Sequence, residues 1–234
     1  MKRFALAGFM LVMFLAMMAP AAMASTVQAK LTGVGLGESS DGYYIDPYTG
    51  TINGLPTNGE NFFCVDFNHE SNIGDTWTAY VTPMTSSDFS DTYLGAKYGS
   101  ATGKIMYEEM AAVVEHFPTV ASGGTYVERV TATWVIWDIS VDDMGKDATT
   151  NFFGSTPADL AEFAAYESDY KTYENIANAY GSDNFSGWEI LTDTKGKDQE
   201  FLVYVPEPNS LIFLGFSLLM VAGAVTLKVR KAHA

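Results

Sequence analysis

The chain contains 234 residues, a length that predicts one main domain with additional terminal segments. Its 28 acidic residues outnumber its 13 basic residues, and the net charge of −15 argues against nucleic-acid binding because a phosphate backbone attracts a basic surface. Hydrophobic residues make up 47% of the chain, which predicts a folded core and excludes a disordered chain. The only cysteine, Cys64, excludes an intramolecular disulfide and a multi-cysteine metal site.

Residues 1–24 have the three parts of a secretory signal peptide. A positively charged start, Lys2-Arg3, precedes the apolar run 4–18, and alanines in a small-x-small pattern follow. The predicted signal peptidase site consists of Ala22, Ala24 and Ser25. Cleavage is expected before Ser25. The alternative is an uncleaved membrane anchor, which the short apolar run disfavours.

The next part of the chain, residues 25–103, predicts short antiparallel strands because it is rich in Gly, Thr, Ser, Asn and aromatic residues. Turn-forming pairs separate its short apolar stretches, and they are Asp41-Gly42, Asn53-Gly54 and Asn58-Gly59. The predicted strands cover residues 26–34, 42–48, 60–68 and 76–82.

In the middle of the chain the apolar spacing changes to three and four residues. This spacing predicts a helix over residues 104–117, which the following proline ends. Residues 126–140 predict a second helix, with a strand as the alternative because of their β-branched content. Residues 157–180 predict a third helix, with Thr156 as its N-cap and Pro157 at its first position.

Strand character returns at residues 188–192 and 199–205, on either side of a turn at Lys195-Gly196-Lys197. The order of strands, helices and strands predicts an α+β fold in which a β sandwich or barrel carries a helical insertion. The exported domain is predicted to span residues 25–205. All 28 acidic residues but only eight basic residues lie within residues 25–207, so this part of the chain carries a charge of −20.

Residues 206–234 predict a membrane segment that a short polar stretch precedes and a basic stretch follows. The triplet Pro206-Glu207-Pro208 precedes the apolar segment 211–227, which as a helix would be about 26 Å long, near the lower limit for a bilayer span. The basic residues that follow are Lys228, Arg230 and Lys231. They are expected to stay in the cytoplasm, so the exported domain would lie on the other side of the inner membrane.

This C-terminal arrangement closely resembles the PEP-CTERM sorting signal of bacteria that make an exopolysaccharide. In that family an exosortase, a membrane transpeptidase-like enzyme, recognises the Pro-Glu-Pro motif and removes the tail. The resemblance implies that Pro206, Glu207 and Pro208 are recognition residues and that the helix 211–227 is a transient anchor. The alternative is an ordinary tail anchor.

Two internal segments resemble the bacterial thioester domain. Residues 61–66, which contain Cys64, look like its aromatic-Cys-aliphatic-Asp strand, and residues 132–138 look like its Gln-x-Ala-Ile-Trp helix. In that family the Cys thiol and the Gln carboxamide form an internal thioester that captures surface nucleophiles. Thr133 stands at the glutamine position, so the resemblance implies an inactive site and a free, buried Cys64. The chain has two glutamines, both outside the matching segment: Gln28 and Gln199.

One segment offers oxygen ligands at alternate positions, and Asp66, Asn68 and Glu70 form a candidate calcium site. Ser71 replaces the glycine that an EF-hand loop requires, so the alternative is a solvated strand face.

Catalytic templates are missing from the sequence, so no catalytic residue and no cofactor is predicted. Outside the tail only His69 and His116 could serve a histidine-based triad, and the chain has no Gly-x-Ser-x-Gly motif. It also has no phosphate loop, His-Glu-x-x-His motif or dinucleotide fingerprint. A carbohydrate-active enzyme would need two carboxylates that converge in one cleft.

These features predict an exported bacterial cell-surface or extracellular-matrix protein with a structural, adhesive or binding role. Its expected partners are signal peptidase, the exosortase and the membrane during export, and exopolysaccharide or a surface ligand afterwards. Two alternatives stay open: a thioester-type covalent adhesin and a secreted carbohydrate-active enzyme.

Overall fold

The computed structural model describes residues 25–40, 43–56, 62–119, 122–141, 157–179, 181 and 185–205. The predicted signal peptide 1–24, the triplet Pro206-Glu207-Pro208, the apolar segment 211–227 and the basic tail lie outside the described residues. So do Thr156 and the turn pairs Asp41-Gly42 and Asn58-Gly59. None of the described helices combines the length and the apolar composition that a membrane span requires.

The described strands are β1 (Ser25–Val34), β2 (Ser39–Ser40), β3 (Tyr43–Tyr44), β4 (Tyr48–Ile52), β5 (Leu55–Pro56), β6 (Phe62–Cys64), β7 (Thr76–Pro83), β8 (Trp188–Asp193) and β9 (Phe201–Tyr204). The described helices are α2 (Tyr93–Tyr98), α3 (Ser100–Glu115), α4 (Tyr126–Ser140) and α6 (Pro157–Asn178). All four helices fall between β7 and β8, so the order of elements confirms an α+β fold with a helical insertion.

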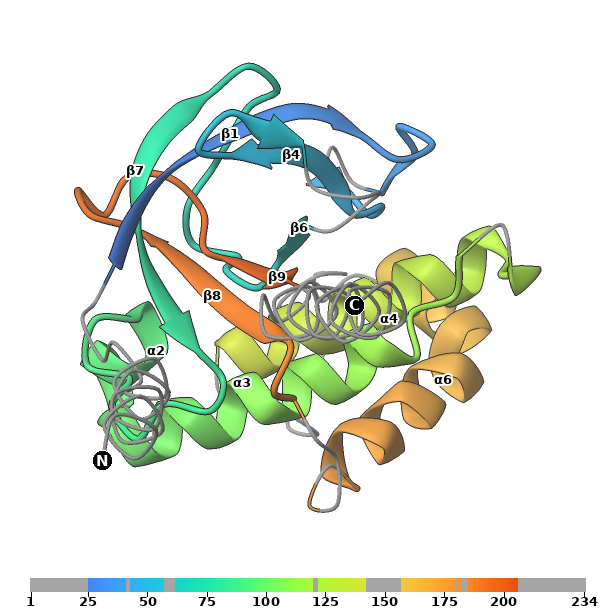
Figure 1. Ribbon diagram of the computed structural model, residues 1–234. Helices are drawn as coiled ribbons and strands as arrows, with labels where there is room; N and C mark the ends of the chain where they lie inside the picture. Colours follow the sequence, from blue (N-terminus) through green and yellow to red (C-terminus); the bar gives the residue numbers. More distant parts are fainter. Residues whose placement is uncertain are drawn as a thin grey trace, which may run out of the picture.

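The main sheet closes on itself. Its strand order is β1-β7-β8-β9-β6-β4-β5, and an additional pairing of β1 with β4 joins the two sides of the sheet. The pairings around this ring are antiparallel. Of the two predicted architectures, the structure therefore has the barrel, which Figure 1 shows above the helices.

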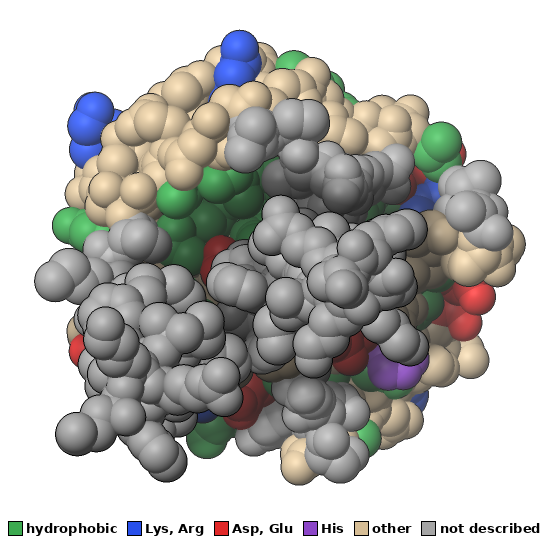
Figure 2. All heavy atoms as spheres, in the orientation of Figure 1, with side chains coloured by type: hydrophobic (Ala, Val, Ile, Leu, Met, Phe, Trp, Pro, Cys, Tyr) green, Lys and Arg blue, Asp and Glu red, His purple; other side chains and the backbone are tan. Residues whose placement is uncertain are grey.

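The barrel has its own apolar interior. Side chains from alternate positions of the strands fill it, as the two-residue period of a strand requires: Ala29, Leu31, Tyr48, Phe62, Trp77, Ala79, Val81, Leu191, Phe201 and Val203. Gly50 in β4 packs closely against β1 and β6. A Cβ at this position would be 2.6 Å from both the Phe62 ring and the Lys30 carbonyl oxygen. In Figure 2 hydrophobic side chains are visible at the end of the barrel that faces the viewer.

The helices cover the outside of one wall of the barrel, next to β8 and β9 (Figure 1). Ile190 and Leu202 point outward from this wall into a second apolar core that α3, α4 and α6 share. Strands β8 and β9 are therefore buried on both faces, which explains why consecutive apolar residues, Ile190-Leu191 in β8 and Phe201-Leu202-Val203 in β9, replace strict alternation.

Helix α4 has the bounds that the sequence predicted, 126–140. A capping box begins it: the Thr125 side chain accepts from the Glu128 N–H, and the Glu128 side chain accepts from the Thr125 N–H. Arg129 then ties α4 to the strands, because its buried guanidinium pairs with Asp46, at 3.0 Å, and with Glu38. The Arg129–Asp46 pair is buried on both sides, so removal of either partner would leave an uncompensated buried charge.

Several predicted bounds are wrong. The strand predicted at 42–48 is replaced by the two-residue β3 and by β4, which starts only at Tyr48. The strand predicted at 60–68 stops at Cys64, because the Asp66 side chain accepts from the Asn68 N–H and turns the chain. The helix predicted at 104–117 starts at Ser100, and α2 was not predicted.

The predicted turns at Asn53-Gly54 and Gly196 are confirmed. Asn53 and Gly54 have φ values of 51° and 77°, as the hairpin between β4 and β5 requires, and Gly196 has φ 62° between β8 and β9.

Candidate functional site

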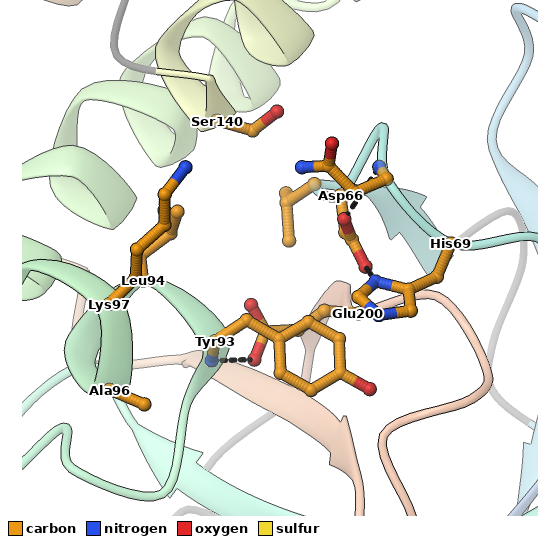
Figure 3. Close-up of a pocket in the computed structure, with 10 residues that line it drawn as sticks. Asp66, His69, Tyr93, Leu94, Ala96, Lys97, Ser140 and Glu200 are labelled. Carbon is orange, nitrogen blue, oxygen red and sulfur yellow. Dashed lines mark hydrogen bonds and ion pairs between the residues drawn. The ribbon is translucent and has the colours of Figure 1, made fainter.

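A cavity of about 400 Å³ lies where the helical insertion meets the barrel. Its wall comes from the loop after β6, from α2, from the end of α4 and from the residue before β9. The polar and aromatic side chains that matter for its chemistry are Asp66, His69, Tyr93, Lys97, Ser140 and Glu200 (Figure 3).

Strand pairing places the two carboxylates of this cavity together. Cys64 pairs with Phe201 in the β6–β9 ladder, and the Val65 N–H donates to the Glu200 carbonyl oxygen at 3.0 Å. Asp66 and Glu200 therefore leave the ends of neighbouring strands and reach the same cavity.

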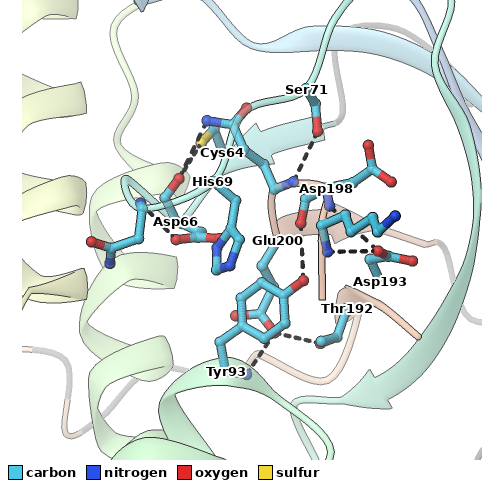
Figure 4. A network of polar contacts seen from close by, with 12 residues as sticks. Cys64, Asp66, His69, Ser71, Tyr93, Thr192, Asp193, Asp198 and Glu200 are labelled. Atoms are coloured by element: carbon cyan, nitrogen blue, oxygen red, sulfur yellow. Dashed lines mark hydrogen bonds and ion pairs between the residues drawn. The ribbon is translucent and has the colours of Figure 1, made fainter. Parts of the chain in front are cut away.

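Glu200 is fully buried and is the centre of a polar network (Figure 4). Its Oε1 accepts from the Tyr93 N–H at 3.1 Å and from the Thr192 hydroxyl, and its Oε2 accepts from the Tyr107 hydroxyl. Burial raises the pKa of Glu200 to about 7, although these hydrogen bonds lower it. Glu200 can therefore hold a proton near neutral pH, which is a property of many general acids.

Asp66 and His69 form a second polar pair in the cavity. Asp66 is 5% exposed, and its Oδ2 lies 2.5 Å from His69 Nδ1 while its Oδ1 accepts from the Asn68 N–H at 2.9 Å. The His69 ring packs on the Tyr93 ring, with 4.7 Å between centroids. Asp66 thus orients the imidazole and leaves Nε2 as its second polar atom.

Two carboxylates that line one cavity are what a glycoside hydrolase needs, with one as acid and the other as base or nucleophile. No sequence pattern pairs Asp66 with Glu200. In this structure both carboxylates are already hydrogen-bonded to protein donors, so they also have a clear structural role in joining α2, β8 and the loop after β6.

The two positions of the thioester resemblance, Cys64 and Thr133, lie together beside a second, very small cavity. Thr133 donates to the Ile45 carbonyl oxygen at 2.8 Å, so its hydroxyl is used to join α4 to the strand side. Cys64 is a free cysteine whose thiol donates to the Asp66 carbonyl oxygen at 3.3 Å. The Cys64 residue as a whole is half-buried. Its sulfur atom is surrounded by protein atoms, and this burial raises the pKa of the thiol to about 12.

Gln199, which is remote from Cys64 in sequence, lies near it in space. Its Nε2 donates to the Asp66 carbonyl oxygen at 3.3 Å, the same atom that accepts from the Cys64 thiol. The residue is 8% exposed, and its Oε1 has no hydrogen-bond partner among the described residues. The β6–β9 pairing brings the two side chains to one acceptor, which no local sequence pattern could indicate.

Two of the three candidate calcium residues, Asp66 and Asn68, line the larger cavity, and the Asp66 side chain accepts from the Asn68 N–H. Glu70 is exposed and lies outside that cavity. No group of three or more His, Cys, Asp or Glu side chains in the described part of the chain is placed to hold a metal ion. Of the two candidate histidines, His69 is in the cavity and His116 caps the end of α3, with Nδ1 2.9 Å from the Ala112 carbonyl oxygen.

Four of the polar and aromatic cavity residues were not singled out in the sequence: Tyr93, Lys97, Ser140 and Glu200. The one signal that could have indicated Glu200 is a carboxylate directly before the fully apolar strand β9, where an ionised side chain needs partners.

No family model, curated protein or solved structure matches this chain. A functional assignment must therefore be argued from the sequence signals and from the chemistry of the site.

Proposed function

We propose that this chain is an exported bacterial cell-surface or extracellular-matrix protein, sorted by an exosortase, whose domain has a structural, adhesive or binding role. The observation that carries the proposal is the position of the folded domain between the two predicted processing signals. Strand β1 begins at Ser25, the predicted first residue after signal-peptide cleavage. Strand β9 ends at Tyr204, two residues before the Pro-Glu-Pro triplet.

Processing at both signals would leave this domain whole. Ser25 is paired with Val81 in the β1–β7 ladder, and the Val205 N–H donates to the Gly187 carbonyl oxygen at 2.8 Å. Both outermost described residues are therefore part of the domain's hydrogen bonding. None of the barrel strands or described helices would be lost with residues 1–24 or with the tail.

The proposal includes the route and the partners. Signal peptidase would act before Ser25, the exosortase would act at Pro206-Glu207-Pro208, and the segment 211–227 would hold the precursor in the inner membrane in between. After release the domain would meet exopolysaccharide or another surface ligand. Its charge of −20 over residues 25–207 keeps it soluble and disfavours nucleic acid as a partner.

The test is to change Pro206, Glu207 and Pro208 to alanine in a host that carries the exosortase. We expect export to continue, because the apolar segment and the basic tail still stop and orient the chain. The variant should stay in the membrane fraction with its tail attached, as shown by intact mass and fractionation. The matched control, Asn209→Ala with Ser210→Ala, changes the adjacent residues and should be released normally. Normal release of the triplet variant would contradict the sorting proposal.

A second candidate function is the thioester-type covalent adhesin, and one observation favours it. Thr133 cannot supply a carboxamide, but Gln199 places one at the same acceptor as the Cys64 thiol. A thioester would form if Cys64 Sγ attacked Gln199 Cδ and ammonia left with the proton of the thiol. The high pKa of the Cys64 thiol opposes this step because little thiolate is present at neutral pH. The intact mass of the chain tests for the thioester, because its formation lowers the mass by one ammonia. A Gln199→Ala variant would abolish that loss.

A further inference from the structure

The larger cavity has a buried polar floor and an accessible rim. The floor residues Asp66, Ser140 and Glu200 are 5%, 2% and 0% exposed. The rim residues Asn68 and Lys97 are exposed, and Figure 3 shows Lys97 and Ser140 facing Asp66 and His69 across the cavity. A small molecule could therefore enter at the rim and meet Asp66 and Ser140 below it, while Glu200 has no exposed surface and lies behind them.

The wall presents hydrogen-bond donors and acceptors together. Among the described residues, neither the Lys97 ammonium nor the Asn68 side-chain amide makes a hydrogen bond or ion pair. Lys97 Nζ lies 4.6 Å from the centroid of the Tyr98 ring, a contact that leaves its N–H groups able to donate to a ligand. The Ser140 hydroxyl donates to the Trp137 carbonyl oxygen at 2.6 Å, which leaves its oxygen lone pairs as acceptors. A hydroxyl group is both donor and acceptor, so a ligand that carries several hydroxyls matches this wall better than one with donors or acceptors alone.

The charges of the wall nearly balance. Lys97 is positive, Asp66 is negative and paired with His69, and Glu200 has a pKa of about 7 and so is only partly ionised at neutral pH. A strongly charged ligand would meet a compensating charge and a repelling charge within the same cavity. A neutral ligand avoids this electrostatic repulsion.

The rest of the wall is apolar. Val65, Leu94 and Ala96 line the cavity, and the Tyr93 ring packs on the His69 ring beside them. The volume of about 400 Å³ is near the lower end of the range for small-molecule sites. A ring compound with apolar C–H faces and several hydroxyls fits both the size and the mixed wall.

We propose that this cavity binds one unit of a neutral saccharide. Asn68 and Lys97 donate to it at the rim, Asp66 and Ser140 meet its hydroxyls at the floor, and Tyr93 and Leu94 cover its apolar face, while Glu200 lies behind the floor and holds Tyr93 through its backbone N–H. The inference rests on the proposed function, because it gives the binding role of the exported domain a position and a class of ligand.

The test uses the full-length chain, purified in a detergent without a sugar headgroup. D-glucose, D-galactose, D-mannose and N-acetyl-D-glucosamine are titrated separately, and binding is followed by saturation-transfer NMR. We expect at least one of these sugars to bind, and we expect Asn68→Ala and Lys97→Met each to weaken it about fivefold to tenfold. Both side chains are at the exposed rim, so the variants should fold normally, which their circular dichroism spectra would check.

Asn72→Ala and Lys195→Met are matched controls. Both residues are exposed and lie outside the cavity, so binding should be unchanged. The proposal is overturned if none of the four sugars binds, if the rim variants bind as well as the controls, or if D-glucuronate or D-glucosamine binds tenfold more tightly than every neutral sugar. Cleavage of an oligosaccharide of the bound sugar would support the site. Because this assay needs no exosortase, its failure would leave the sorting experiment unaffected.

Discussion

Glu200 is the most deeply buried carboxyl group of the cavity, and its three donors come from three separate elements. Tyr93 belongs to α2, Tyr107 to α3 and Thr192 to β8. One side chain thus joins the barrel wall to the first two helices of the insertion. Because each of these donors is itself buried or half-buried, removing the carboxylate would leave donors without partners at the barrel–helix junction.

The raised pKa of Glu200 predicts how stability depends on pH. Its pKa is about 7 in the folded protein against 4.5 in the unfolded chain, so the folded state holds this proton more tightly. The contribution to the free energy of unfolding is fully present below about pH 4.5 and is lost as the pH rises through about 7, by roughly a few kcal/mol. Denaturant unfolding at pH 5, 6, 7 and 8 measures this loss.

Glu200→Gln should have a flatter stability profile over the same range, since it cannot ionise. Glu70→Gln removes one exposed negative charge and serves as the control, with a profile like that of the unmodified protein. Equal slopes in Glu200→Gln and the unmodified protein would show that Glu200 does not titrate in this range.

Cys64 is predicted to be a free thiol that reacts slowly in the folded protein. Its pKa of about 12 leaves little thiolate at pH 8, and the protein surrounds its sulfur. Titration with a thiol reagent should give almost no reaction in native buffer and one thiol per chain in denaturant. An absence of reactive thiol in denaturant, with a mass lower by one ammonia, would instead support the Cys64–Gln199 thioester.

At the scale of elements, the cavity depends on how closely α2 packs on α3. A Cβ at Gly103 in α3 would lie 2.5 Å from the Gly95 nitrogen in α2, which is closer than atoms can approach. Gly95 in turn lies against the Phe89 carbonyl oxygen, at 1.8 Å from the position of a Cβ. The two glycines thus let α2 lie deep enough for Tyr93 and Leu94 to line the cavity.

Gly103→Ala is therefore expected to push α2 away from α3 and to destabilise the protein by about 1–3 kcal/mol. Thermal and denaturant unfolding would measure the change. Thr102→Ala, at the exposed neighbouring position on α3, introduces the same residue without the contact and should change stability by less than about 0.5 kcal/mol. A stability of Gly103→Ala equal to that of the control would mean that α2 can move at no cost.

At the scale of the whole molecule, the folded domain and the two predicted processing signals occupy separate parts of the chain. The described domain starts with β1 at Ser25 and continues to Val205. Its helices are an insertion between two paired barrel strands, β7 and β8. Closure of the barrel therefore requires pairing between strands that lie on opposite sides of the insertion in the sequence. The strands that form this ring lie within residues 25–204.

We therefore predict that the exported protein begins at Ser25 and is as stable as the unprocessed chain. N-terminal sequencing identifies the first residue, and unfolding of the two forms compares their stability. Ser25 is already within the β1–β7 ladder, so a cut more than a few residues further along would remove pairs with β7 and lower stability. A product that begins at Met1 and stays in the membrane would contradict the signal-peptide prediction.

Elements whose signals are local could be predicted from the amino-acid sequence. The helix at 126–140 was predicted at its observed bounds because a three- and four-residue apolar spacing is read within one segment. The turn at Asn53-Gly54 was predicted for the same kind of reason, since these residues favour positive φ. The α+β class followed from the order of such segments, and the terminal signals stay predictions based on composition and motif alone.

The sequence left sandwich and barrel open as alternatives, because closure of the sheet depends on the pairing of β1 with both β4 and β7. The same kind of long-range pairing also sets the composition of the site. Asp66 and Glu200, and likewise Cys64 and Gln199, meet because β6 pairs with β9 across more than half of the chain. This strand pairing joins residues far apart in the sequence, and it is stabilised by the burial of both faces of the β8–β9 wall. The sequence near either residue therefore contains no pattern from which the contact could be predicted.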